Sequence, residues 1–402
     1  MDISWNERLS DGAHRITSSA IRDLLKLTEQ PAVISFAGGL PAPECFPTAE
    51  LTAAAERVLT VHPMAALQYG PTEGYAPLRS FLAARMAALN MPVLTEQVLI
   101  TSGSQQALDL LGKLFLDTSA LVVVEEPTYL GALQAWRPYG PRFVTLPLDD
   151  EGLDVIALAR LLATGAQPRF LYLVSCFQNP TGVTLSPARR HALIELAARY
   201  ALPIVEDDPY GDLSYGGERP EPLAALDIAL HGELRHVIYL SSFSKIVAPG
   251  LRIGWVAAPA GLSRKLAHAK QGLDLHTGSL AQATACEACH AGLLNEHVPR
   301  IRATYRTRRD TLLAALEHQM PPGVRWTHPA GGMFIWLTLP EQVDATELLY
   351  TALEQQVAFV PGATFHANGG GTATLRLNFS STAPERITEG VRRLGQAMRS
   401  RL

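Results

Sequence analysis

The chain has 402 residues, of which 47% are hydrophobic and 18% charged, so it is long enough for two domains and is not of the disordered class. Its formal net charge of −4 lacks the basic surplus of nucleic-acid-binding proteins. The N-terminus carries no signal-peptide segment, and no apolar run approaches membrane-spanning length. We therefore expect a cytoplasmic protein with no membrane partner and no nucleic-acid partner.

Glycines and prolines are closely spaced in residues 1–50, which favours extended chain. We expect this segment to form an arm and part of a small domain, because an extended segment of this kind does not fold alone. Short apolar runs then alternate with helical patterns until the pattern changes near residue 297. This order predicts an α/β fold, with a large domain over residues 51–296 and a smaller α+β domain over residues 297–402.

Six short apolar runs lie between about residues 97 and 260. Runs that are apolar on both faces suit a mostly parallel sheet that lies between helices. The intervening segments are expected to be helical, including residues 105–115 and a helix from Pro187 to Tyr200 with Ser186 as its N-cap. The expected strands cover residues 98–100, 121–124, 170–174, 203–205, 237–240 and 253–256.

Polar residues follow five of these strands directly. In open α/β sheets, ligands bind beyond the carboxyl ends of the strands, so these side chains should meet in one site. The five strand ends supply a helix N-terminus suited to an anion, an aromatic ring, an amide, a carboxylate with a tyrosine, and a lysine. The segments are residues 101–105, 125–129, 178–182, 206–210 and 241–245.

The last of these segments carries the clearest chemical signal. Ser242, Ser244 and Arg252 suit a dianionic phosphate, because hydroxyls donate hydrogen bonds and a guanidinium binds two oxygens at once. Lys245 beside a phosphate indicates a cofactor that carries both a phosphate and an aldehyde. Pyridoxal 5'-phosphate (PLP) is such a cofactor, and lysine forms its Schiff base. The alternative is a surface lysine in a serine-rich turn.

The four cysteines are expected to be reduced thiols in a cytoplasmic chain. Cys286, Cys289 and His290 match the C-x-x-C-H pattern of haem attachment. However, they lie within residues 280–295, whose alanines, leucines and glutamates predict a helix. We therefore expect neither haem attachment nor a metal site.

Together these segments resemble the fold type I PLP-dependent aminotransferases of class I/II, and within them the 2-aminoadipate/kynurenine branch. The resemblance covers nearly the whole chain and depends on several stretches that occur in the family's order and spacing. They are residues 18–27, 35–43, 68–75, 178–182, 206–210 and 241–252. The resemblance implies the PLP-transferase fold and PLP as the cofactor.

The resemblance also implies roles for residues at the reacting end of the cofactor. Lys245 would form the Schiff base and carry the proton between the substrate and the cofactor. Asp207 would hold the pyridine nitrogen protonated, although Asp208 is a chemical alternative. Tyr210 and Asn179 would donate hydrogen bonds to the phenolic oxygen of the cofactor, and Asn179 would also lie at the substrate.

The remaining cofactor contacts are implied in the same way. Tyr129 would stack on the pyridine ring. Tyr69 would reach the phosphate from a neighbouring subunit, so we expect a homodimer with shared active sites. The phosphate site would consist of Ser104, Gln105, Ser242, Ser244 and Arg252.

Substrate recognition is implied at both ends of the chain. Arg376 would bind the substrate α-carboxylate through two N–H groups. Gly39 would let the N-terminal arm approach the substrate closely. Arg22, with Ser19 about one helical turn away, would contact the distal carboxylate of a dicarboxylic substrate. The alternative for Arg22 is an arginine on a helix surface.

We therefore expect an aminotransferase that moves an amino group between an amino acid (2-aminoadipate, glutamate, leucine or an aromatic one) and a 2-oxo acid such as 2-oxoglutarate. The same lysine and cofactor also serve β-lyases, racemases and decarboxylases, which fold alone does not separate. A transcriptional regulator with an aminotransferase-like domain is a further alternative. It is disfavoured because no basic DNA-reading module precedes the arm.

Overall fold

The computed structural model describes residues 3–16 and 32–401. Its centre is an eight-stranded sheet in which β8, β7, β6, β3 and β4 pair in parallel, while β9 runs antiparallel to both β2 and β8. The prediction of a mostly parallel sheet is confirmed. In order across the sheet, the strands are β2 (Val98–Thr101), β9 (Gly254–Ala257), β8 (Val237–Ser242), β7 (Ile204–Asp207), β6 (Phe170–Leu173), β3 (Leu121–Glu126), β4 (Arg142–Asp149) and β5 (Gly152–Leu153).

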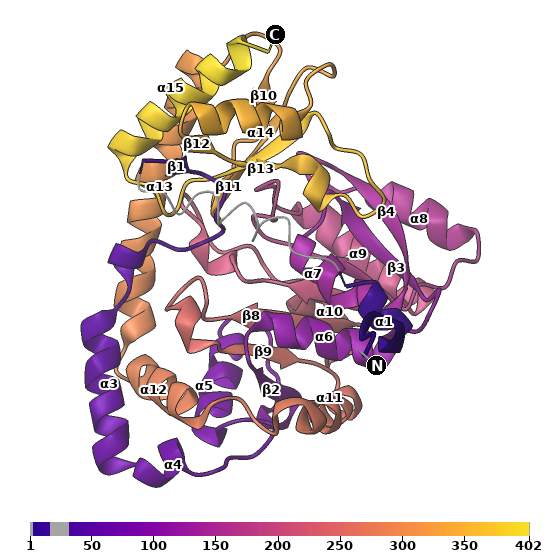
Figure 1. The fold of residues 1–402 in the computed structure, drawn as a ribbon. Coiled ribbons are helices and arrows are strands. Elements are labelled where there is room, and N and C mark those ends of the chain that lie inside the picture. Colours follow the sequence, from indigo (N-terminus) through magenta and orange to yellow (C-terminus); the bar gives the residue numbers. More distant parts are fainter. Residues whose placement is uncertain (1–2, 17–31, 402) are drawn as a thin grey trace.

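Helices cover the sheet on both sides (Figure 1). One group packs together as α8 (Val155–Ala163), α9 (Pro187–Tyr200) and α10 (Leu223–His231). The other group contains α6 (Ser104–Phe115), α7 (Leu130–Trp136) and α11 (Ala260–Asp274). The predicted cap of α9 is present, because the Ser186 side chain accepts a hydrogen bond from the Arg189 N–H.

A second, antiparallel sheet lies in the upper part of the molecule in Figure 1. Its strand order is β10 (Arg325–Trp326), β11 (Phe334–Thr338), β14 (Thr374–Asn378) and β13 (Val360–Pro361). The helices α14 (Ala345–Glu354) and α15 (Pro384–Arg399) belong to the same part, and α15 packs against α13 (Leu293–Gln319). The N-terminal segment joins it, because β1 (Ile34–Ser35) pairs in parallel with β12 (Val357–Ala358).

The helical structure predicted over residues 280–295 is present, but as two helices that meet near Gly292 and not as one. The first helix, α12 (Ser279–His290), ends before Gly292, which has a φ of +92°. Such a φ is left-handed and stops a right-handed helix, and glycine adopts it without a side-chain clash. Helix α13 then starts at Leu293 and continues past Pro299 and across residue 297.

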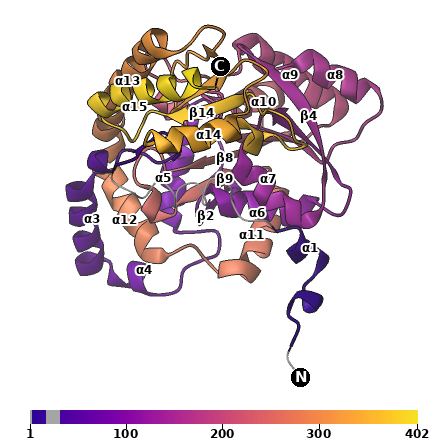
Figure 2. The ribbon, with the colours of Figure 1, turned by 45° about the horizontal axis from the view of Figure 1, so that its top comes forward.

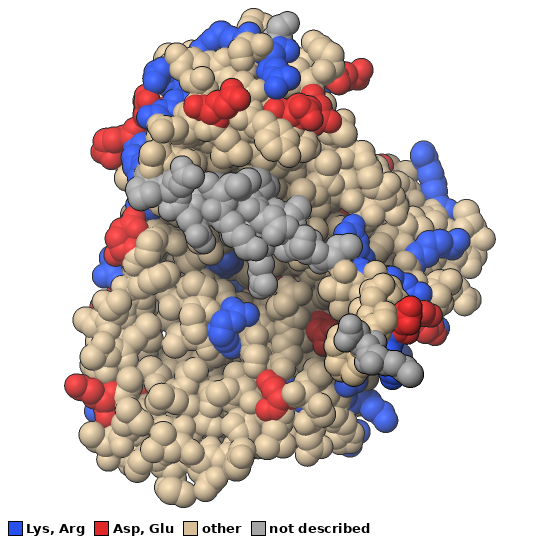
Figure 3. Space-filling model, in the orientation of Figure 1, with Lys and Arg blue, Asp and Glu red and all other residues tan. Residues whose placement is uncertain are grey.

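At the lower left of Figure 1, α12 packs against α3 (Thr48–Val61), α4 (Pro63–Leu67) and α5 (Ala76–Ala87), whereas α1 (Asp11–His14) lies at the right. Figure 3 shows basic and acidic side chains scattered over this face without a continuous basic stripe, and few charges over α4. Figure 2 shows the same layers from a second direction. Within residues 3–16 and 32–401, no helix is both long and hydrophobic enough to span a membrane.

Candidate active site

A cavity of about 400 Å³ opens at the edge of the sheet where the parallel strands end. It brings together residues from the N-terminal segment, five strand ends and the second sheet. Most of the predicted site residues line it. The lining consists of Gly39, Ser104, Gln105, Tyr129, Val174, Asn179, Asp207, Pro209, Tyr210, Ser242, Ser244, Lys245, Pro249, Arg252 and Arg376.

Strand direction explains this gathering. Side chains that follow parallel strands meet at the carboxyl edge of the sheet. Arg252 reaches the same edge differently, since it precedes β9, and β9 runs antiparallel to its neighbour β8. Asp207 of β7 pairs with Leu240 of β8. The chain that continues from Leu240 therefore carries Lys245 toward the Asp207 carboxylate.

One predicted residue lies elsewhere, and two are not described. Tyr69 is 79% exposed and packs edge-on against His276, 5.9 Å between ring centres, so it does not line the cavity of its own chain. Arg22 and Ser19 fall outside the described residues.

Lys245 lies in the cavity with its amine facing the N-terminal segment. Its Nζ donates a hydrogen bond to the Gly39 carbonyl oxygen at 2.9 Å. Burial lowers the pKa of Lys245 to about 8, and the positive charges of Arg376 and Arg252 act in the same direction. A substantial fraction of the amine is therefore neutral near physiological pH, which is the form that attacks an aldehyde.

The two neighbouring aspartates have different environments. Asp207 is buried, its Oδ2 accepts a hydrogen bond from the Tyr172 hydroxyl at 2.9 Å, and its Oδ1 has no hydrogen-bond partner. Asp208 is absent from the cavity lining, and its carboxylate binds Arg219, the Tyr239 hydroxyl and the Gly211 N–H. The free acceptor in the cavity is thus on Asp207.

Burial raises the pKa of Asp207 to about 7. The charge of Asp208 contributes to this rise, whereas the Tyr172 hydrogen bond opposes it. A buried carboxyl group with an unused oxygen lacks a positive partner. A protonated ring nitrogen would supply that partner.

Arg376 is 2% exposed and lies between two aromatic rings, with its guanidinium carbon 4.3 Å from the Phe334 ring centre and 5.0 Å from that of Phe365. Its Nη1 donates to Asn179 Oδ1 and its Nη2 to the Ala37 carbonyl oxygen, both at 2.8 Å. Burial lowers the pKa of Arg376 to about 10. A buried cation with no carboxylate partner is suited to an incoming anion.

The anion cradle lies at the other end of the cavity. The Ser244 N–H and hydroxyl both contact Ser242 Oγ, at 2.9 and 2.8 Å, which holds the two hydroxyls together. Gly103 has a φ of +79°, and a Cβ there would overlap the guanidinium of Arg252. This close approach brings Arg252 to the N-terminus of α6, where N–H groups and the helix dipole favour negative charge.

Gly39 lies in the cavity lining, and its close approach to the substrate stays a prediction. A Cβ on Gly39 would meet the Phe334 ring at 3.5 and 3.8 Å, which are ordinary contacts. The part that Gly39 plays in this structure is its carbonyl oxygen, which accepts the Lys245 hydrogen bond.

Two buried residues beside the cavity were not predicted. Tyr172 carries the hydroxyl that fixes Asp207, and Glu125 accepts hydrogen bonds from the Val174 N–H and Gln178 Nε2. Burial raises the pKa of Glu125 to about 8, and the charge of Asp207 adds to the effect. The only signal for Tyr172 is a hydroxyl within an otherwise apolar run of residues 170–174.

The donor set fits PLP. One end of the cavity offers hydroxyls, N–H groups and Arg252 for a phosphate, and the other offers the unpartnered Oδ1 of Asp207 for a ring nitrogen. Lys245 supplies the amine for an aldehyde, and the two tyrosines Tyr129 and Tyr210 supply aromatic surface and hydroxyls. Burial raises the pKa values of both tyrosines, so their hydroxyls remain neutral donors.

Comparisons with known proteins identify the family. The family model "Aminotransferase class I and II" matches residues 44–394. The chain belongs to this family. The 2-aminoadipate transaminase of Thermus thermophilus is 49% identical, with 100% of this chain and 98% of that protein covered. Aromatic-amino-acid aminotransferase 1 of Thermococcus litoralis is 46% identical, with 100% and 96% covered.

A solved structure agrees with this identification. The crystal structure of LysN, the α-aminoadipate aminotransferase of Thermus thermophilus, is complexed with N-(5'-phosphopyridoxyl)-L-leucine. It matches with a TM-score of 0.93 at 47% identity and covers 99% of each chain. The aminotransferase is thus a PLP-dependent enzyme of fold type I, whose substrates are amino acids and 2-oxo acids. The predictions of family, fold, cofactor and reaction type are confirmed.

Proposed function

We propose that this aminotransferase moves an amino group between 2-aminoadipate and 2-oxoglutarate, and that it serves lysine biosynthesis. The observation that carries the transfer reaction is the buried cation Arg376, suited to the α-carboxylate of any amino acid, which shares a cavity with Lys245 and Asp207. The Thermus relatives, a 2-aminoadipate transaminase and the α-aminoadipate aminotransferase LysN, support the dicarboxylic substrate. Because the Thermococcus relative is named for aromatic amino acids, leucine and aromatic substrates are included as slower donors.

When bound, PLP takes up the amino group and withdraws electrons from the substrate α-carbon. In our proposal Asp207 holds the proton on the ring nitrogen, since its unpartnered Oδ1 is the buried acceptor in the cavity. Tyr210 and Asn179 donate to the phenolic oxygen, and Tyr129 packs on the ring. Ser104, Gln105, Ser242, Ser244 and Arg252 hold the phosphate.

Lys245 moves the proton in this scheme. Its lowered pKa gives a neutral amine that can accept the proton from the substrate α-carbon. The same amine then delivers the proton to C4' of the cofactor. Arg376 holds the α-carboxylate in place during the transfer, and its two N–H groups exchange the Asn179 and Ala37 oxygens for the carboxylate oxygens.

A single-turnover experiment tests the transfer. The purified enzyme is mixed with 2-aminoadipate alone, and release of the 2-oxo acid is measured together with conversion of the bound cofactor to its pyridoxamine form. We expect one 2-oxo acid per active site. No turnover with 2-aminoadipate, but full turnover with phenylalanine, would contradict the proposed substrate and leave the aminotransferase intact.

Arg22 is proposed to contact the distal carboxylate, with Ser19 beside it. For Arg22→Ala we expect kcat/KM to fall on 2-aminoadipate and glutamate and to stay largely unchanged on leucine. Arg15→Ala is the matched control, because the Arg15 guanidinium donates to the Pro138 carbonyl oxygen, away from the cavity lining. An equal loss of kcat/KM on acidic and apolar substrates would show that Arg22 does not bind the distal carboxylate.

We also propose a homodimer in which Tyr69 enters the partner's active site. Exposed apolar side chains surround Tyr69 on α3 and α4, which suits a subunit contact. They are Leu59, Val61, Met64 and Leu67.

Mixing two inactive variants tests this arrangement. Tyr69→Ala subunits and Lys245→Ala subunits are unfolded and refolded together, so that mixed dimers form. If Tyr69 acts across the interface, the mixed dimer contains one complete site and activity returns. If Tyr69 acts within its own chain, neither site is complete and the mixture stays inactive.

A further inference from the structure

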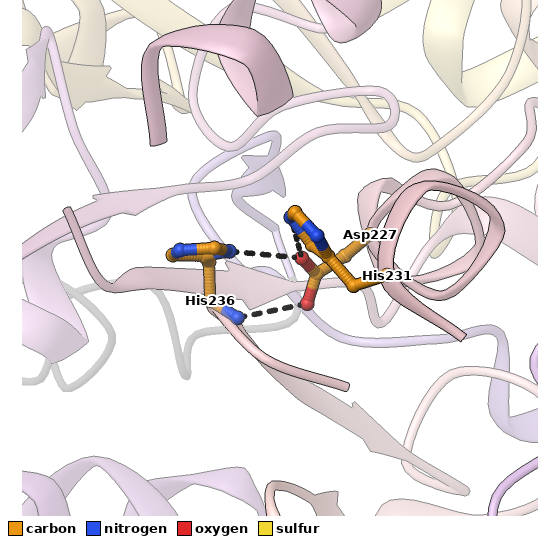
Figure 4. A group of neighbouring side chains, drawn as sticks. All are labelled: Asp227, His231 and His236. Carbon is orange, nitrogen blue, oxygen red and sulfur yellow. Dashed lines mark hydrogen bonds and ion pairs between the residues drawn. The ribbon is translucent and has the colours of Figure 1, made fainter. Parts of the chain in front are cut away.

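A cluster of two histidines and one aspartate lies at the opposite end of β8 from the active site. Asp227 and His231 come from the last turns of α10, and His236 directly precedes β8. Figure 4 shows the Asp227 carboxylate between the two imidazole rings. The ligand atoms of the three residues all lie within 4.8 Å of one another.

We propose that these three side chains bind a divalent transition-metal ion, Zn²⁺. The spacing fits, because His236 Nδ1 and His231 Nε2 lie 3.2 and 3.7 Å from Asp227 Oδ1. Ligand atoms bound about 2.0–2.1 Å from a tetrahedral ion are roughly 3.3–3.4 Å apart. Imidazole nitrogen and carboxylate oxygen are both common zinc ligands.

The backbone hydrogen bonds of Asp227 occupy one oxygen, and the other contacts His236 Nδ1 at 3.2 Å, a hydrogen bond that a bound ion would replace. Its Oδ2 accepts the N–H groups of Arg235, His236 and Val237, at 2.7, 2.9 and 3.1 Å. Oδ1 receives no backbone N–H and faces the two rings (Figure 4). The backbone contacts thus orient the carboxylate, as outer-shell hydrogen bonds do at metal sites.

His231 provides an independent observation. Its Nε2 is buried and has no hydrogen-bond partner among the described residues, and the 3.7 Å to Asp227 Oδ1 is too long for a hydrogen bond. A buried ring nitrogen without a hydrogen bond is unfavourable unless another group, such as a metal ion, satisfies it. An ion bound by all three groups satisfies this atom.

The surroundings leave room for a fourth ligand. The His231 and His236 side chains keep 14% and 13% of their surface exposed, while Asp227 is fully buried. Water can therefore complete a tetrahedral ion at this edge.

The site lies roughly 15–20 Å from Lys245, given about 3.3 Å per residue along β8. We infer that the ion fastens the end of α10 to the start of the strand whose other end leads to the catalytic lysine.

Cobalt titration of the PLP-loaded enzyme tests the site. The enzyme is first treated with a chelator and then titrated with Co²⁺, whose visible spectrum reports a four-coordinate ion. We expect saturation at one Co²⁺ per chain and displacement by Zn²⁺. His231→Gln and His236→Gln should each weaken binding at least about tenfold. His268→Gln, which changes an exposed histidine on α11, should bind as the wild type does.

Three outcomes would overturn the proposal. The first is a titration of the wild type without saturation, which needs no variant to interpret. The second is unchanged Co²⁺ affinity in both histidine variants. The third is a strong thiolate-to-cobalt band, which would assign the ion to Cys286 and Cys289. Because the ion binds the folded chain only, Zn²⁺ should also raise the melting temperature of the wild type and of His268→Gln, but not of the two ligand variants.

Discussion

Replacing Asp207 with asparagine separates the burial of a charge from its use in holding PLP. Asparagine has nearly the same size and keeps an oxygen that can accept the Tyr172 hydrogen bond. It carries no negative charge. The variant therefore lacks the buried anion whose Oδ1 has no hydrogen-bond partner among the described residues. Relative to the wild type, the substitution should stabilise the cofactor-free protein and destabilise the PLP-bound protein. This reversal makes the test specific.

The size of the effect follows from the pKa of Asp207, which burial raises from 3.8 to about 7. At about 1.4 kcal/mol per pH unit, the ionised group destabilises the cofactor-free fold by about 4 kcal/mol. The folded state binds the proton more tightly than the unfolded state. The loss of stability is therefore absent below pH 3.8, grows with rising pH and is complete above about pH 7.

The assay is the unfolding of cofactor-free wild type and Asp207→Asn at pH 5 and pH 8. We expect the stability advantage of the variant to grow by roughly 2–3 kcal/mol between these pH values. Adding PLP should reverse the order, because a protonated ring nitrogen stabilises the charged carboxylate and not the amide. A parallel pH dependence of both proteins without PLP, or equal stabilisation of both by PLP, would refute the reasoning.

Asp208→Asn is the matched control for this experiment. The Asp208 carboxylate accepts from Tyr239 and Gly211 and pairs with Arg219, which is half-buried. Removing the Asp208 charge takes one of two carboxylates from Arg219, which still pairs with Asp212 at 2.7 Å, and should destabilise the protein by about 1–3 kcal/mol, with or without PLP.

Three further substitutions test other parts of the site. Lys245→Ala should slow the single-turnover half-reaction by about 10²–10⁴-fold. In the wild type, the rate at which Lys245 captures the PLP aldehyde should rise with pH and level off above about pH 8. Arg376→Gln should lower kcat/KM about 100-fold or more, mainly through KM, because a charged contact is lost. Gly103→Ala should displace Arg252 and weaken PLP binding at least about tenfold, measured by equilibrium titration. Gly165 has a similar φ of +85° with open space around it, so Gly165→Ala should leave PLP binding unchanged.

The strands, their polar ends and the chemistry that those ends supply were predictable from local sequence patterns. Apolar runs such as residues 121–124 and 237–240 are local signals of a covered parallel sheet, and the sheet edge then brings their following residues together. Lys245, Asn179 and Tyr210 could be assigned to one site on this basis. Helix α9 was also predictable, because its N-cap and proline are adjacent in the sequence.

Which of two adjacent residues faces the cavity, and what it contacts there, depends on how the chain packs in three dimensions. Asp207 and Asp208 are adjacent and chemically alike, but successive residues at a strand end point in opposite directions, and only Asp207 reaches the cavity. The Arg376 contacts join residues up to 339 positions apart, and His231 meets His236 across a helix–strand junction. Such contacts depend on how distant elements pack, and local sequence patterns do not encode that packing.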